Sequence, residues 1–178
     1  MYDAVLRNIN LSKEQYGNSK WKAGLGLHRH TERLSDKNYY LATIHRAENT
    51  DDRSKLEKIF TAFERLDKPV LMPIHPRTRK LIETMDLKLD NTILIDPVGY
   101  LLMLYLTSNA YMVVTDSGGL QKEAYFLQTP CTTLRDQTEW IETLENEWNV
   151  LSPIVIDTII KTAKRELVCL QHPQPQLF

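Results

Sequence analysis

The chain has 178 residues, of which 42% are hydrophobic and 25% charged, so it can bury the core of one globular domain and is not disordered overall. Its 22 Lys and Arg nearly balance its 23 Asp and Glu, and the formal net charge of −1 gives no electrostatic reason to expect nucleic acid or an anionic membrane as a partner. Cys131 and Cys169 form no CxxC motif, which argues against a structural zinc site and favours a reducing compartment, with the cytoplasm as the default.

Residues 1–38 are predicted to form a helix and a loop ahead of the main domain. Weak helical periodicity over residues 4–11 gives way to a glycine-containing stretch. His28 and His30 could be metal ligands, but no carboxylate or cysteine has matching spacing, so we interpret them as part of a solvated loop. The sequence contains no apolar run of membrane-spanning length, and its N-terminus lacks the basic and apolar regions of a signal peptide.

From Tyr39 onward, short apolar runs alternate with helical patterns, which predicts an α/β fold: a Rossmann-like parallel sheet with helices on both faces. The predicted strands are 39–44, 70–74, 92–95, 111–114, 131–134 and 148–151. The predicted helices begin at Asp51 or Asp52 and then span 76–85, 100–106, 118–128, 139–145 and 154–167. We therefore expect one domain over 39–168 and a loose tail over 169–178.

Polar residues follow the predicted strands, at 45–49, 75–77, 96–100, 116–119 and 135–136. The carboxyl ends of parallel strands share one edge of the sheet, where ligands of such folds bind. A single histidine at a strand end is more often structural than a ligand contact. Two histidine-containing turns, two arginines and a Gly-Gly helix start on one edge favour a site for a phosphorylated ligand.

The segment 115–124, TDSGGLQKEA, carries the clearest sign of an anion site. Asp116 or Ser117 can cap the following helix, and the Gly-Gly pair lets another group approach the unpaired amides at the helix N-terminus. Glu123 lies on the flank of the apolar face, where a carboxylate needs donors such as sugar hydroxyls. Taken alone, this motif would be an ordinary Gly-rich turn with a surface glutamate, so the interpretation depends on the other strand ends.

Ordered motifs across residues 39–151 resemble the C-terminal half of the non-hydrolysing UDP-N-acetylglucosamine 2-epimerases. The motifs are TIHRAENT (43–50), PIHPRTRK (73–80), DPVGY (96–100), TDSGGLQKEA (115–124) and LRDQTE (134–139). The resemblance implies one half of a GT-B fold. Residues 1–38 would include part of the segment joining the two halves, with the N-terminal half and the family's final Gly-Asp-Gly segment missing from this chain.

The resemblance also implies the reaction, an anti elimination of UDP from UDP-GlcNAc followed by its return with C2 inverted, giving UDP-ManNAc for cell-surface polysaccharide synthesis. No metal and no cofactor are expected. His45 would be the catalytic residue, stabilising the departing UDP. Ser117, Gly118 and Gly119 would hold the diphosphate on their amides, Glu123 the ribose and Met103 the uracil. Arg46 and His75 resemble residues of a second, activating UDP-sugar site.

Two departures from the family pattern stand out. Trp140 occupies a position where many members have an arginine close to the nucleotide, and Lys122 replaces a frequent acidic residue on a helix face that should matter little. The carboxylates that act on the C2 proton in the family belong to the other half. We therefore expect this chain to be inactive alone.

Three interpretations remain open. In the first, the chain is the C-terminal half of an epimerase, with homo-oligomers expected among full-length relatives. In the second, it is a nucleotide-sugar binding module, either a remnant or a subunit completed by a separate N-terminal partner chain. In the third, it is half of a glycosyltransferase of the same architecture. The motifs at 45–49 and 116–119 favour the epimerase family over a transferase.

Overall fold

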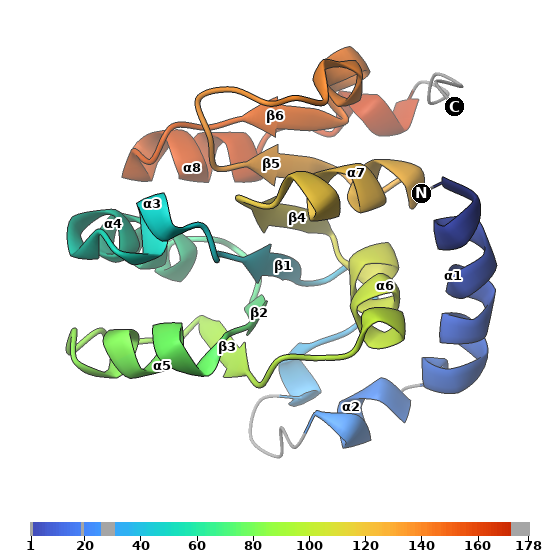
Figure 1. Ribbon diagram of the computed structural model, residues 1–178, viewed down its shortest axis with the longest axis horizontal. Coiled ribbons are helices and arrows are strands. Elements are labelled where there is room, and N and C mark those ends of the chain that lie inside the picture. Colours follow the sequence, from blue (N-terminus) through green and yellow to red (C-terminus); the bar gives the residue numbers. More distant parts are fainter. Residues whose placement is uncertain (1, 19, 26–30, 172–178) are drawn as a thin grey trace.

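A computed structural model describes residues 2–18, 20–25 and 31–171, in which six parallel strands form one sheet with helices on both faces (Figure 1). The predicted fold class is confirmed. The strand order is β3-β2-β1-β4-β5-β6. The strands are β1 Tyr40–Thr43, β2 Val70–Pro73, β3 Thr92–Ile95, β4 Met112–Thr115, β5 Cys131–Thr133 and β6 Asn149–Leu151. His28 and His30 lie outside the described residues.

The helices divide between the two faces of the sheet. In Figure 1, α4, α5 and α8 lie on one side of the sheet, and α1 and α6 lie on the other, where α7 also packs. Short 3-10 helices, η1 to η3, lie in the connections. The bounds are α1 Tyr2–Tyr16, α2 Lys20–Gly24, η1 Thr31–Arg33, α3 Ala47–Thr50, α4 Arg53–Glu64, α5 Pro76–Glu83, α6 Tyr100–Asn109, α7 Gly118–Phe126, η2 Ile141–Glu147, α8 Ile156–Ala163 and η3 Val168–Gln171.

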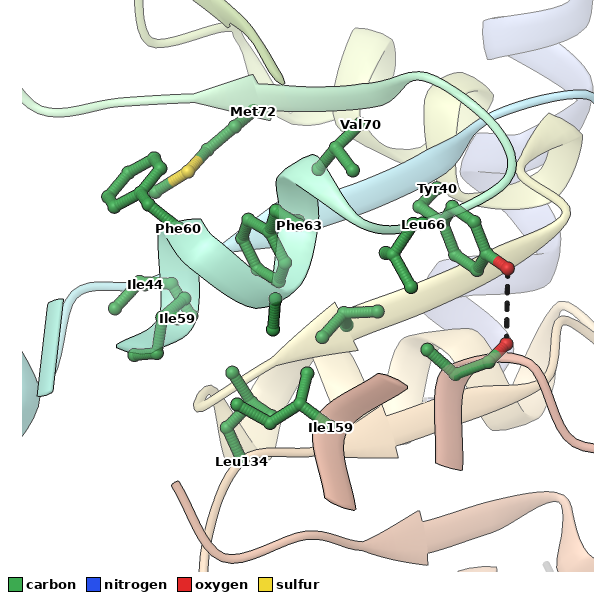
Figure 2. Close-up of a cluster of buried hydrophobic side chains, with 14 of the residues drawn as sticks. Tyr40, Ile44, Ile59, Phe60, Phe63, Leu66, Val70, Met72, Leu134 and Ile159 are labelled. Atoms are coloured by element: carbon green, nitrogen blue, oxygen red, sulfur yellow. Dashed lines mark hydrogen bonds between the residues drawn. The ribbon is translucent and has the colours of Figure 1, made fainter. Parts of the chain in front are cut away.

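Both faces of the sheet are apolar because helices cover both. Successive side chains of a strand point to opposite faces, so Tyr40 enters the cluster beneath α4 and α8, while Leu41 enters the cluster beneath α6 and α7. Figure 2 shows Phe60 and Phe63 extending from α4 into the first of these clusters. The Tyr40 hydroxyl donates to Asp67 Oδ1 at 2.9 Å and lies 3.2 Å from the Ala163 carbonyl oxygen.

The predicted last helix, 154–167, is wrong in length, because α8 ends at Ala163. Arg165 explains the early end. Its guanidinium donates to the Thr162 carbonyl at 2.7 Å and then reaches the carbonyls of Cys131 and Glu147 at 2.9 and 3.0 Å. Binding these carbonyls draws the chain back over the sheet after the last helical turn.

The short helix predicted at 139–145 is present as the 3-10 helix η2, which begins two residues later and is kinked. Asn146 has a φ of 51°, in the left-handed region that breaks a regular helix. At the C-terminal end, η3 contains the buried Cys169, and residues 172–178 lie outside the described part of the chain. The domain limits set from the sequence remain predictions.

The N-terminal helix packs on the body of the domain. Ser12 on α1 donates from its hydroxyl to the Leu101 carbonyl at 2.7 Å, and the Tyr2 ring meets Phe126 edge to face with centroids 5.2 Å apart. Trp21, on α2, is buried against Tyr39. Of the described helices, none combines the length and the apolar character that crossing a membrane requires.

Candidate functional site

The sheet reverses its strand order between β1 and β4. The chain runs from β1 outward through β2 and β3, then returns to place β4 on the other side of β1. Thr43 and Thr115, the last residues of these two strands, are in register, and their hydroxyl oxygens lie 2.6 Å apart. Ligands of open parallel sheets bind beyond the carboxyl ends of the strands at such a reversal.

Asp116 joins the two loops that leave this point. Its side chain is fully buried, and its carboxylate accepts hydrogen bonds from the His45 and Arg46 amides at 3.2 and 3.0 Å and from Asn49 Nδ2 at 3.0 Å. The sequence suggested Asp116 or Ser117 as a helix cap. The cap is Ser117, whereas Asp116 fixes the loop between β1 and α3.

His45 lies just after β1, at the carboxyl edge of the sheet. Its Nδ1 lies 3.2 Å from Asp116 Oδ1, while its side chain remains 59% exposed. The hydrogen bond to Asp116 raises the pKa of His45 above its usual value, and burial and Arg46 oppose the rise. Burial alone would raise the pKa of Asp116, but the hydrogen bonds from His45, Asn49 and the backbone outweigh it and hold that pKa below its usual range. The pair favours an imidazolium with an exposed ring edge.

The N-terminus of α7 presents unpaired amides. Ser117 Oγ accepts from the Leu120 amide at 3.3 Å, and the Ser117 amide donates to Thr115 Oγ1 at 2.9 Å. In the described part of the chain, the Gly118 and Gly119 amides have no acceptor. These two amides, with the Ser117 hydroxyl and the positive end of the helix dipole, can bind an anion.

A loop after β5 closes one side of this helix start. Arg135, whose side chain is only 10% exposed, binds both Glu139 carboxylate oxygens, at 2.8 and 2.9 Å. This pairing lowers the pKa of Glu139 to about 2. Arg46 lies 3.9 Å from Glu139 and donates from Nε to the Asp116 carbonyl at 2.9 Å. From the sequence, Arg135 and Glu139 are identified only as members of the LRDQTE motif and have no assigned role, because the sequence does not show that their side chains pair.

Glu123 lies one helical turn beyond the open amides and is partly buried, as its position on α7 predicts. Burial raises the pKa of Glu123, and the neighbouring Tyr100 hydroxyl opposes the rise. Met103 is partly buried on α6, against the same apolar cluster as Leu120 of α7. Tyr100 is not predicted from the sequence as a site residue, although Tyr100 is the last residue of the DPVGY motif (96–100).

Arg46 and His75, the two residues assigned from the sequence to a second UDP-sugar site, have different hydrogen-bond partners. His75 caps α5, where its Nδ1 accepts from the Arg77 amide at 3.3 Å. Arg46 turns instead toward Asp116, Glu48 and Glu139. No hydrogen bond or ion pair joins Arg46 to His75 in the structure as described over 2–18, 20–25 and 31–171, although both follow strands at the same edge.

Groups of three or more His, Cys, Asp or Glu side chains able to hold a metal ion do not occur among the described residues. Both cysteines are buried free thiols. Burial raises the pKa of Cys131 to about 12, so this thiol is neither a ready nucleophile nor a ready metal ligand. The chemistry that the edge offers is therefore anion binding with a histidine beside it.

Comparisons with known proteins point to one family. The model of the UDP-N-acetylglucosamine 2-epimerase family matches residues 1–175. A Methanococcus maripaludis UDP-N-acetylglucosamine 2-epimerase homolog is 47% identical over 156 residues, which cover 85% of this chain and 41% of that protein. The UDP-2,3-diacetamido-2,3-dideoxy-D-glucuronate 2-epimerase of Pseudomonas aeruginosa is 48% identical over 147 residues, covering 81% of this chain and 41% of that protein.

A solved structure is similar in fold as well. The Methanocaldococcus jannaschii UDP-GlcNAc 2-epimerase, in complex with UDP-GlcNAc and UDP, superposes with a TM-score of 0.75 at 37% identity, covering 93% of this chain and 46% of that one. The chain thus spans less than half the length of each of these three relatives.

Proposed function

The chain belongs to the UDP-N-acetylglucosamine 2-epimerase family, and from this premise we propose that it is the UDP-binding C-terminal half of an epimerase acting on a UDP-linked 2-acetamido sugar. The observation that carries the proposal is the pair of open amides at Gly118 and Gly119, set beside the His45–Asp116 pair at the reversal of the sheet. Membership of this family disfavours the transferase alternative.

The proposed chemistry needs a stabilised leaving group. The bond from C1 to the UDP oxygen breaks while C2 loses its proton, the electrons forming a C1–C2 double bond. UDP then returns to C1 as a proton reaches the opposite face of C2. In this half, the Gly118 and Gly119 amides and the Ser117 hydroxyl bind the diphosphate, and the His45 imidazolium offsets its growing charge. Glu123 accepts hydrogen bonds from the ribose hydroxyls, and Met103 borders the uracil.

The sugar itself is a separate question. The P. aeruginosa relative is named for a diacetamido uronic acid and the M. maripaludis relative for N-acetylglucosamine, at 48% and 47% identity. UDP is common to both names, and the residues assigned above would hold UDP. UDP-N-acetylglucosamine is our first candidate, and the P. aeruginosa relative makes UDP-2,3-diacetamido-2,3-dideoxy-D-glucuronate the second.

We further propose that activity requires an N-terminal half, supplied as a partner chain or as additional sequence, and that the complete enzyme is a homo-oligomer. The matched relatives are more than twice as long as the region that they share with this chain. Arg46 and His75 would contribute to a second UDP-sugar site once that half is in place. The free thiols of Cys131 and Cys169 suit a reducing compartment such as the cytoplasm.

The direct test of the proposal is UDP binding by the 178-residue chain. We expect a calorimetric signal and a thermal shift with UDP and a weaker signal with uridine, because the amides at α7 would bind phosphate oxygens. Circular dichroism would establish that the sample is folded. If a folded sample gives neither heat nor thermal shift at millimolar UDP, the proposed function of this site is wrong.

A second prediction separates ribose binding from phosphate binding. Glu123→Ala should weaken UDP by about 1.5–3 kcal/mol, the scale of a hydrogen bond to a charged group, and leave pyrophosphate affinity unchanged. Glu123→Gln keeps the shape of the side chain and tests whether the charge is needed. Calorimetric titrations of both ligands with each variant make the comparison. Equal weakening of UDP and pyrophosphate would mean that Glu123 acts through the fold of α7 instead.

A further inference from the structure

Trp140 lies in the loop that closes over the N-terminus of α7. Its indole Nε1 is 3.3 Å from the position that a Cβ would occupy at Gly118. The indole N–H has no hydrogen-bond acceptor among the residues that the structure describes. We propose that this N–H is a further donor to the phosphate bound at Gly118 and Gly119. This inference rests on the proposed function and adds a specificity residue to that site.

The loop that carries Trp140 is held rigidly against α7. The fully buried Gln121 of α7 donates from Nε2 to Thr143 Oγ1 at 2.7 Å and accepts from Thr138 Oγ1 at 2.9 Å. Thr138 Oγ1 in turn accepts from the Trp140 amide at 3.1 Å, and Thr143 Oγ1 donates to the Trp140 carbonyl at 2.7 Å. The backbone of Trp140 is therefore fixed relative to the helix start before any ligand arrives, which lowers the entropic cost of binding.

Lys122 positions the indole ring. Its ammonium nitrogen lies 3.7 Å from the centroid of the Trp140 ring, a cation–π contact that favours one orientation of the ring. The sequence led us to expect that Lys122 matters little on its helix face, whereas the structure places its ammonium over the Trp140 ring. The ammonium also adds positive potential beside the proposed phosphate position.

The other side chains around Gly118 are already paired. A Cβ at Gly118 would lie 3.6 Å from Glu139 Oε2 and 3.8 Å from an Arg135 guanidinium nitrogen. These two groups bind each other in the two-bonded pair described above. Of the three side chains nearest to this position, Trp140 is the one whose donor has no partner among the described residues. It is a neutral donor, so it selects phosphate oxygens by direction rather than by charge.

The test uses Trp140→Phe, which keeps a ring for Lys122 and removes the N–H. We expect UDP affinity to fall about 10- to 100-fold, the range for a hydrogen bond to a charged group, while uridine affinity stays unchanged. Ile141→Ala is the matched control, because Ile141 is the neighbouring side chain and is 71% exposed. Calorimetry with UDP and uridine on all three proteins gives the comparison.

An NMR measurement of UDP binding is made on the unaltered chain, so its result does not depend on whether a variant still binds UDP. The chain has three tryptophans, so its spectrum contains three indole N–H resonances, and the one missing from Trp140→Phe is assigned to Trp140. We expect UDP to shift this resonance downfield and uridine to leave it in place.

A UDP-saturated sample with an unmoved Trp140 resonance, or a Trp140→Phe variant with full UDP affinity, overturns the inference and leaves the proposed function standing. Loss of UDP and uridine binding together overturns it too, since it indicates a structural role. Absence of UDP binding in the unaltered folded chain instead contradicts the proposed function itself.

Discussion

Asp116→Ala should lower the free energy of unfolding by about 3–5 kcal/mol, the scale for removing one partner of a buried charged network. The carboxylate is fully buried and accepts from the His45 and Arg46 amides, from Asn49 Nδ2 and from His45 Nδ1. Alanine leaves these donors without their acceptor, and both Asp116 and Asn49 are buried from water. Urea denaturation followed by circular dichroism measures the loss.

Asp96→Ala is the matched control. Asp96 also follows a strand at the carboxyl edge, but its side chain is 93% exposed and contacts Arg79 at 3.3 Å. An exposed ion pair of this kind contributes about 0–1 kcal/mol, so the control should unfold close to the unaltered chain. Similar losses for both variants would contradict the role that we assign to burial and to the network around Asp116.

We expect the contact between Asp116 and His45 to make nucleotide binding depend on pH. The Asp116 hydrogen bond raises the pKa of His45 above its usual value of 6.5, so the stabilising imidazolium persists above pH 6.5 and is lost as pH rises through the raised pKa. Affinity for UDP-N-acetylglucosamine, whose diphosphate does not titrate in this range, should fall over that same interval. Asp116→Asn should move the fall to lower pH, toward 6.5. Calorimetry from pH 5 to 9, an interval of roughly two units on each side of the histidine range, would show it.

The fold could be predicted because its signals are local and repeated. Apolar runs such as 70–74 and 92–95 are short, bounded by turn residues and separated by helical patterns, and each became a strand within a residue or two. Parallel strands then place every β-to-α turn on one edge, so the positions of His45 and Ser117 at the site follow from the chain order alone.

The parts that were missed depend on contacts between distant residues. Asp116 meets His45 and Asn49 about 70 positions away in the chain, and no local pattern distinguishes such a residue from a helix cap. The end of α8 likewise depends on Arg165 reaching Cys131, and the indole of Trp140 acquires its role only beside Gly118. A sequence shows which residues are available at an edge, whereas tertiary packing decides which of them are used.

The prediction with the largest expected effect concerns catalysis. The 178-residue chain alone should not exchange the C2 proton of UDP-N-acetylglucosamine, because the three carboxylates around the start of α7 already have other partners or assigned roles. Asp116 is buried beneath His45, and Glu139 is bound at both oxygens by Arg135. Glu123 lies on α7 in the position that we assign to the ribose. A positioned general acid or base typically contributes about 10²–10⁴-fold, and holding the sugar against a second wall contributes further.

The assay is incorporation of solvent deuterium at C2, followed by NMR. We expect no incorporation above background with the chain alone, even when calorimetry shows that the nucleotide sugar is bound. Adding an N-terminal half from a full-length relative should start the exchange, and His45→Gln in this chain should then slow it, since amide binding of the diphosphate would remain while the imidazolium is lost. Exchange by the chain alone at the rate of a full-length relative would place the acid and base in this half. The carboxylates of Glu123 and Glu139 would then have to be reassigned.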